Sequence, residues 1–93
     1  MKILAVCGFG VGSSMVLKMT LDKVVKELGL KATVENTDLS SAKATPADVY
    51  FTSNELLADL KKSVKAPVYP VKKYMDIAEV RKQMEKYLEE RGE

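Results

Sequence analysis

The sequence predicts an α/β domain in which helices cover both faces of a four-stranded parallel sheet, with the strands in the spatial order 2-1-3-4. Apolar, strand-like runs alternate along the chain with amphipathic segments, and the connections are short enough for right-handed βαβ crossovers. Two of the runs have the character of central strands and two have that of edge strands. The chain has 93 residues, which is enough for one hydrophobic core, so we expect a single domain over residues 1–93.

The first predicted strand and the first predicted helix lie on either side of a glycine-rich segment. Residues 3–6 form a continuous apolar run, as expected of a central parallel strand that is covered on both faces. An apolar stripe at helical spacing follows, and its members are Leu17, Leu21, Val24 and Leu28. We expect this helix to begin at Met15 and to end at Gly29.

The middle of the chain predicts an edge strand and a second central strand. Residues 31–36 alternate polar with small or apolar side chains, so one face of this strand meets solvent, which suits the edge of a sheet. The polar residues 37–45 leave room for one short helical turn. Residues 48–52 are β-branched and aromatic, which is typical of a central strand.

The last third of the chain predicts a helix, an edge strand and a closing helix. Ser53 or Asn54 can cap a helix over about residues 55–62. Two prolines in residues 67–71 remove backbone donors, which confines that strand to a sheet edge.

The closing helix has a start signal and an apolar stripe. Asp76 and Glu79 have the spacing of a capping box, although the box prefers Ser or Thr at its first position. The stripe that follows consists of Ile77, Val80, Met84 and Tyr87.

Composition excludes several classes of function. The net charge of +2 is too small to predict nucleic-acid binding. No apolar run is long enough to span a bilayer and the opening residues do not resemble a signal peptide, so we expect a cytoplasmic protein. The chain has no histidine and one cysteine, Cys7, which excludes a Ser-His-Asp triad, an internal disulfide and the common zinc sites. We therefore expect neither a metal nor a cofactor.

The segment after Cys7 has the composition of an anion-binding loop. Three glycines, Gly8, Gly10 and Gly12, let the backbone turn tightly and point its N–H groups inward, beside the start of a helix. In open α/β sheets, ligands bind at this edge, near the switch point between the first and third strands. We expect the same N–H groups to lower the pKa of Cys7 and make it a nucleophile. The alternative is that Cys7 extends the apolar strand and the glycines form a simple turn.

Other phosphate-binding loops fit the segment poorly. A P-loop requires a Lys directly before its Ser or Thr, which neither Ser13 nor Ser14 has, and a dinucleotide fingerprint has a different glycine spacing. A cysteine-dependent phosphatase has an Arg six residues after its cysteine, where this chain has Ser13. Without that guanidinium a phosphocysteine can form but hydrolyses slowly, which is the behaviour of a phosphoryl carrier.

On these residues the chain resembles the IIB components of the bacterial phosphoenolpyruvate-dependent sugar phosphotransferase system, the ascorbate type first and the galactitol type second. The resemblance implies a flavodoxin-like fold, similar to that of low-molecular-weight phosphatases, and no cofactor. It also implies that Cys7 accepts a phosphoryl group from a phosphohistidine of a IIA protein. Cys7 then passes this group to an ascorbate-like or polyol sugar, which is bound only within the complex with the membrane transporter IIC. The residues it implies around the phosphate are Gly8, Phe9, Gly10, Val11, Gly12, Ser13 and Ser14.

Two further features suggest how such a carrier meets its partners. Lys72 and Lys73 lie at the same sheet edge and can attract an anionic partner, or they are simply solvated lysines. Met15 and Met19 lie off the apolar stripe of their helix and suit a docking surface, or they pack under a neighbouring loop. We expect a monomer that associates peripherally with IIC. A phosphatase-like hydrolase and a non-catalytic IIB-like regulatory module remain as alternatives.

Overall fold

Four strands and four helices alternate along the part of the chain that the computed structural model describes, which is residues 1–7 and 10–91, without the side chains of residues 10–14. The strands are β1 (Lys2–Cys7), β2 (Thr33–Asp38), β3 (Val49–Thr52) and β4 (Val68–Pro70). The helices are α1 (Gly10–Leu28), α2 (Leu39–Ala44), α3 (Asn54–Ser63) and α4 (Ile77–Glu90).

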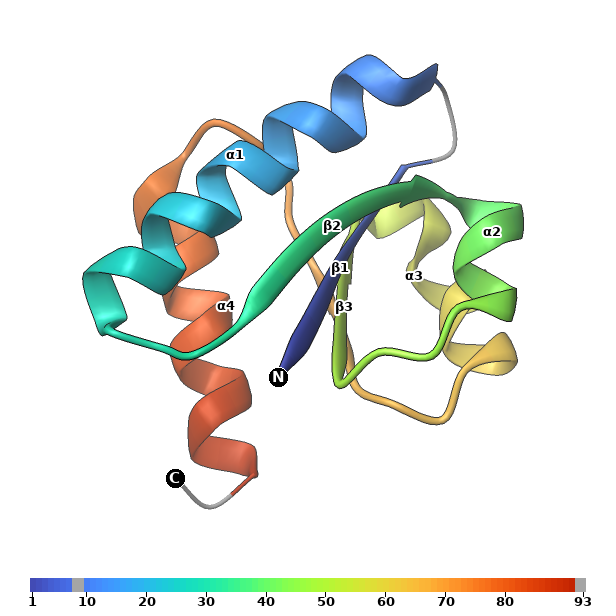
Figure 1. Cartoon of the computed structure of the whole chain (residues 1–93). Coiled ribbons are helices and arrows are strands. Elements are labelled where there is room, and N and C mark those ends of the chain that lie inside the picture. The colour runs from blue at the N-terminus through green and yellow to red at the C-terminus, as the bar shows by residue number, and fades with distance from the viewer. Residues whose placement is uncertain (8–9, 92–93) are drawn as a thin grey trace.

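The strands form one parallel sheet in the order β2-β1-β3-β4, which confirms the predicted order (Figure 1). Ile3 in β1 is in register with Val34 on one side and with Val49 on the other. All strands therefore present their carboxyl ends at the same edge of the sheet. The end of α4 lies at the opposite edge, where β1 begins (Figure 1).

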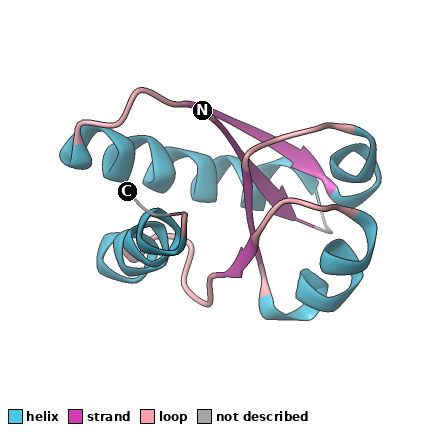
Figure 2. Ribbon diagram, turned by 90° about the horizontal axis from the view of Figure 1, so that it is seen from below, coloured by secondary structure: helices cyan, strands magenta, loops and turns pink. Residues whose placement is uncertain are grey.

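Side chains of β1 alternate between two hydrophobic clusters, one on each face of the sheet. Ile3 and Ala5 belong to the cluster that contains apolar residues of α1 and α4, whereas Leu4 and Val6 belong to the cluster with α2 and α3. Figure 2 shows the two pairs of helices on opposite sides of the sheet. A strand buried on both faces needs an uninterrupted apolar run, which is what residues 3–6 supply.

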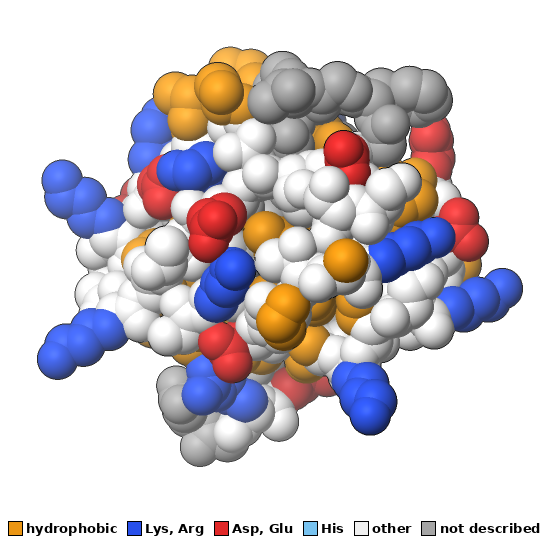
Figure 3. Space-filling view, turned by 45° about the vertical axis from the view of Figure 1, so that its right-hand side comes forward, with side chains coloured by type: hydrophobic (Ala, Val, Ile, Leu, Met, Phe, Trp, Pro, Cys, Tyr) orange, Lys and Arg blue, Asp and Glu red, His pale blue; other side chains and the backbone are white. Residues whose placement is uncertain are grey.

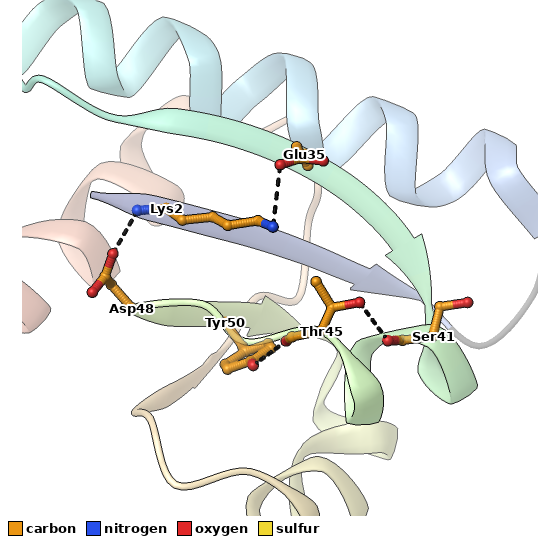
Figure 4. Close-up of polar contacts among 6 residues, drawn as sticks. All are labelled: Lys2, Glu35, Ser41, Thr45, Asp48 and Tyr50. Carbon is orange, nitrogen blue, oxygen red and sulfur yellow. Dashed lines mark hydrogen bonds and ion pairs between the residues drawn. The ribbon is translucent and has the colours of Figure 1, made fainter.

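Polar contacts fix the edge of the sheet where the strands begin (Figure 4). The backbone N–H of Lys2 donates to the Asp48 carboxylate at 2.6 Å, and the Lys2 ammonium lies 3.4 Å from Glu35. The Tyr50 hydroxyl donates to the Thr45 carbonyl at 2.6 Å, which holds the connection between α2 and β3. Every buried side-chain N and O atom in the described residues has a hydrogen-bond partner.

Several predicted boundaries shift. The second strand begins and ends two residues later than predicted, and the short helical turn expected within residues 37–45 is α2. Asp38 caps α2 by accepting a 2.7 Å hydrogen bond from the Ser41 N–H. Gly29 ends α1 as predicted, in the left-handed conformation with φ of 66°.

The largest correction concerns the start of α1. The helix begins at Gly10 rather than at Met15, so backbone that was expected to be a loop forms its first turns. The loop was expected because three glycines let the backbone turn tightly, and glycine is in addition disfavoured within helices by about 1 kcal/mol relative to alanine. Gly10 stands at the start of the helix, where glycine is tolerated better than in the interior.

Candidate functional site

Cys7 is the last residue of β1, at the carboxyl edge of the sheet and beside the switch point between β1 and β3. On one side it is in register with Asp38 of β2. On the other side the backbone pairing of β1 with β3 ends at Ala5 and Phe51. Beyond that pair, the buried Thr52 hydroxyl donates to the Val6 carbonyl at 2.8 Å. The Thr52 side chain therefore joins β1 and β3 at the point where their backbone pairing has ended.

Helix α1 starts three residues after Cys7, so its first turn lies close in sequence to the thiol. The N–H groups of a first helical turn are free to bind an anion, and the helix dipole adds partial positive charge there. Gly8 and Phe9 lie outside the described residues. Five other residues were predicted to surround a phosphate, and only their helical backbone is described. These residues are Gly10, Val11, Gly12, Ser13 and Ser14.

The Cys7 thiol is buried against Tyr74, a residue of the segment between β4 and α4. The alternation along β1 directs Cys7 to the same face as Ile3 and Ala5, which is the face covered by α1 and α4. Cys7 is 2% exposed, and its thiol shares a side-chain hydrogen bond with the Tyr74 hydroxyl. This contact joins two residues that are far apart in the sequence.

Burial raises the pKa of the Cys7 thiol above its ordinary value, and the hydrogen bond from Tyr74 opposes that rise. The predicted lowering of this pKa is therefore wrong, because the prediction counted hydrogen-bond donors and not the desolvation of a buried thiolate. Burial, followed by the hydrogen bond with Cys7, raises the pKa of Tyr74 to about 12. The Tyr74 hydroxyl consequently keeps its proton at neutral pH and acts as the donor to sulfur.

Ser53 extends this contact into a chain of three side chains. It occupies the N-cap position of α3, as predicted, but its hydroxyl makes no capping hydrogen bond. It bonds the Tyr74 hydroxyl instead, and this contact lowers the pKa of Tyr74, as expected if Ser53 donates. Ser53, Tyr74 and Cys7 therefore connect the carboxyl ends of three strands.

Backbone contacts hold Tyr74 in place. The Thr20 hydroxyl of α1 donates to the Tyr74 carbonyl at 2.5 Å. The Glu79 carboxylate accepts from the N–H groups of Lys72 and Lys73 at 2.7 and 2.9 Å. Glu79 was expected to complete a capping box, and it anchors this segment instead. The sequence analysis placed Tyr74 at the correct edge of the sheet but did not identify its contact with the thiol.

The side chains that were predicted to meet partners are on the surface. Met15 is 49% exposed and Met19 is 56% exposed, as expected for residues off the apolar stripe. Lys72 and Lys73 are exposed as well. In addition, Met75, which directly follows Tyr74, is 80% exposed.

Other parts of the described structure offer less chemistry. A hollow of about 310 Å³ lies at the opposite edge of the sheet, between Thr45, Tyr50 and Ser63. Among residues 1–7 and 10–91, no cluster of three or more His, Cys, Asp or Glu side chains could hold a metal ion. Within the same ranges, no helix combines the length and hydrophobicity needed to cross a membrane.

Three matches to known proteins each span most of the chain. Residues 2–86 match the sequence model of a family described as "PTS system, Lactose/Cellobiose specific IIB subunit". The chain is 33% identical over 90 residues, 95% of each sequence, to the "Ascorbate-specific PTS system EIIB component" of Mycoplasma pneumoniae (strain ATCC 29342 / M129 / Subtype 1).

The third match is a solved structure, the lactose-specific IIB component domain of the phosphoenolpyruvate:carbohydrate phosphotransferase system (PTS) from Streptococcus pneumoniae. It superimposes with a TM-score of 0.67 over 96% of this chain and 91% of that one, at 13% identity. At this identity the likeness concerns the fold, which is the predicted flavodoxin-like arrangement of a parallel sheet between two helical layers.

Proposed function

Because the chain belongs to the IIB family of phosphoenolpyruvate-dependent phosphotransferase systems, whose members are phosphotransferases, we propose that it carries a phosphoryl group on Cys7. The donor is a phosphohistidine of a IIA protein, and the acceptor is a sugar bound by the membrane transporter IIC. The observation that carries this proposal is the position of Cys7, at the end of β1, just before α1 and in contact with Tyr74.

The first transfer exchanges a proton for a phosphoryl group. The sulfur of Cys7 attacks phosphorus, the nitrogen–phosphorus bond of the donor breaks, and the imidazole of the donor receives the thiol proton. The raised pKa of Cys7 keeps the thiol protonated at neutral pH until a partner binds. Tyr74 stabilises the negative charge that develops on sulfur during the attack, since its hydroxyl is held as a donor.

The second transfer reverses this exchange. A sugar hydroxyl attacks phosphorus, the sulfur–phosphorus bond breaks, and the hydroxyl proton returns to the thiolate. Between the two steps, the N–H groups of the first turn of α1, within residues 10–14, hold the phosphoryl oxygens. Gly8 and Phe9 complete this binding site, with the hydroxyls of Ser13 and Ser14. Ser13 occupies the position at which cysteine-dependent phosphatases have an Arg, so water attacks the phosphocysteine slowly.

The resemblance to the ascorbate type and the 33% identical relative favour ascorbate or a related acidic sugar as the acceptor. The chain works in the cytoplasm as a monomer and associates peripherally with IIC. Membranes that contain the matching IIC are expected to phosphorylate ascorbate, and not galactitol or lactose, when the phosphorylated chain is supplied. Phosphorylation of galactitol alone would assign the chain to the second type.

The test is the intact mass of the chain after incubation with phosphoenolpyruvate, enzyme I, the phosphocarrier HPr and IIA. We expect a gain of one phosphoryl group in the wild type and none in the Cys7→Ala variant. No gain in the presence of an active IIA would refute the carrier function. Rapid turnover of an aryl phosphate by the purified chain would support the phosphatase alternative.

A further inference from the structure

Four apolar side chains near the site are exposed, and we call them the methionine patch. They are the large hydrophobic side chains exposed within residues 1–7 and 15–91, with exposed fractions of 49% for Met15, 36% for Val16, 56% for Met19 and 80% for Met75. Three of them lie on α1, and Figure 3 shows hydrophobic side chains at the top of the molecule, over this helix. Exposed apolar patches of this kind often mark sites of protein–protein contact.

The patch borders a small hollow that is linked to the site. Val16, Met19 and Met75 line this hollow of about 150 Å³, together with Thr20 and Lys23. Thr20 is also the residue whose hydroxyl holds the Tyr74 carbonyl. A cavity of about 150 Å³ accommodates one benzene-sized group. The hollow therefore suits one aromatic or branched side chain of a partner that approaches Cys7.

Lysine side chains lie beside the patch, Lys23 in the lining of the hollow and Lys72 and Lys73 shortly before Met75 in the sequence. Among the described residues, the ammonium groups of Lys23, Lys72 and Lys73 have no ion-pair partner. Of the nearby acidic groups, Asp22 pairs with Lys18 at 2.8 Å, Glu79 accepts two backbone hydrogen bonds and Asp76 caps α4, whereas Glu55 acts on Tyr74 through its charge. An acidic or phosphorylated partner surface would be attracted to this side of the molecule.

We infer that the methionine patch docks the phosphohistidine protein that donates to Cys7, an inference that rests on the proposed function. The donor inserts one apolar side chain into the hollow, and acidic groups around its phosphohistidine face Lys23, Lys72 and Lys73. These three lysines argue against the transporter as the partner of the patch. Cytoplasmic loops of membrane proteins are rich in Lys and Arg and would repel them. A second copy of this chain fits poorly, because a symmetric contact would bring the lysines beside one patch close to the same lysines of the other copy.

The chain offers a direct test, because its five methionines are split between the patch and elsewhere. Each methionine methyl group gives one NMR signal when the protein is labelled with ¹³C-methyl methionine. On addition of unphosphorylated IIA protein, we expect the signals of Met15, Met19 and Met75 to shift. Met84, which is fully buried, and Met1, at the far end of β1, serve as internal controls.

A kinetic measurement complements the binding experiment. The double variant Met19→Ser/Met75→Ser is expected to raise the KM of the chain as a substrate of phosphorylated IIA by about fivefold or more, with little change in kcat. The apolar variant Met19→Leu/Met75→Leu should behave like the wild type. To test the charges, the KM of the variant Lys72→Ser/Lys73→Ser is compared with the KM of Lys43→Ser/Lys65→Ser. The second variant changes the net charge equally, but at the opposite edge of the sheet.

The outcomes separate this inference from the proposed function. Patch shifts without phosphorylation of Cys7 would support the docking surface and refute the carrier function. Phosphorylation of Cys7 without patch shifts, and with an unchanged KM in the serine variant, would refute the docking surface alone. A serine variant that is impaired only in transfer to the sugar would overturn the inference in favour of the transporter. Concentration-dependent patch shifts without any partner would overturn it in favour of a second copy.

Discussion

The hydroxyl of Thr20 in α1 donates a 2.5 Å hydrogen bond to the backbone carbonyl of Tyr74. The helix that starts beside Cys7 is thereby tied to the segment that covers the thiol. Because the Tyr74 hydroxyl bonds the thiol itself, Thr20 fixes the backbone of the residue that contacts Cys7. Thr20 is itself buried, with 5% exposure, which limits the alternative positions of its side chain.

Removing the Tyr74 hydroxyl by the substitution Tyr74→Phe is expected to raise the pKa of Cys7 further, because the contact that opposes the effect of burial is lost. Phosphorylation of Cys7 at neutral pH should slow by about 2- to 10-fold, which corresponds to the net free energy of one hydrogen bond. The pKa is measured from the pH dependence of thiolate absorbance. Tyr69→Phe is the matched control, since the Tyr69 hydroxyl bonds Glu90 at 2.5 Å and not the thiol. Equal pKa values in the two variants would contradict the role of Tyr74.

Ser53→Ala is expected to destabilise the protein less than a normal N-cap deletion. Ser53 makes no capping hydrogen bond, whereas Asp76 caps α4 by accepting from the Glu79 N–H at 3.2 Å. Asp76→Ala should therefore lower the free energy of unfolding by about 1 kcal/mol, and Ser53→Ala by less. Urea unfolding curves measure both. Ser53→Ala should instead slow the phosphorylation of Cys7, because Tyr74 loses its donor. Equal losses of stability would indicate that Ser53 is an ordinary cap.

The pH dependence of stability should report the burial of Cys7. The pKa of this thiol is raised in the folded protein above its ordinary value of 9.0, so the folded state holds the proton at pH values where the unfolded chain has lost it. Its contribution to stability is therefore complete below pH 9 and is lost as the pH rises through the folded pKa. Urea unfolding between pH 7 and pH 10 measures this loss, which Cys7→Ala should lack. Identical slopes in the two proteins would contradict the raised pKa.

Leu60→Ala is expected to lower the free energy of unfolding by about 2–5 kcal/mol, because Leu60 is fully buried and anchors α3 to the sheet. Since Ser53 stands at the start of this helix, the same variant should weaken the contact between Ser53 and Tyr74. Leu57→Ala is the control, because Leu57 is only partly buried beside the same cluster. Thermal unfolding of the two variants measures the difference. A Leu57 variant that is as unstable as the Leu60 variant would place the anchor of α3 elsewhere.

The sequence was sufficient to predict the strand order and to place Cys7 at the carboxyl edge of the sheet. Residues 3–6 are apolar without interruption and residues 67–71 contain two prolines, so central and edge strands differ in composition. Tyr74 could not be assigned a role, because its contact with Cys7 depends on how α4 and β4 pack. The direction of the Cys7 pKa shift was wrong for the same reason. Burial is a property of the folded molecule, and a run of glycines does not reveal it.

The start of β1 and the end of α4 lie at the edge of the sheet opposite Cys7 (Figure 1). An affinity tag, a fluorophore or another protein can therefore be attached at either end without covering the thiol. A surface-immobilised chain would turn the sheet edge that holds Cys7 toward the solution, so the exchange of partners could be followed by surface plasmon resonance. A genetic fusion to a donor or acceptor domain would need a linker that reaches around the sheet before the fused domain could contact the site.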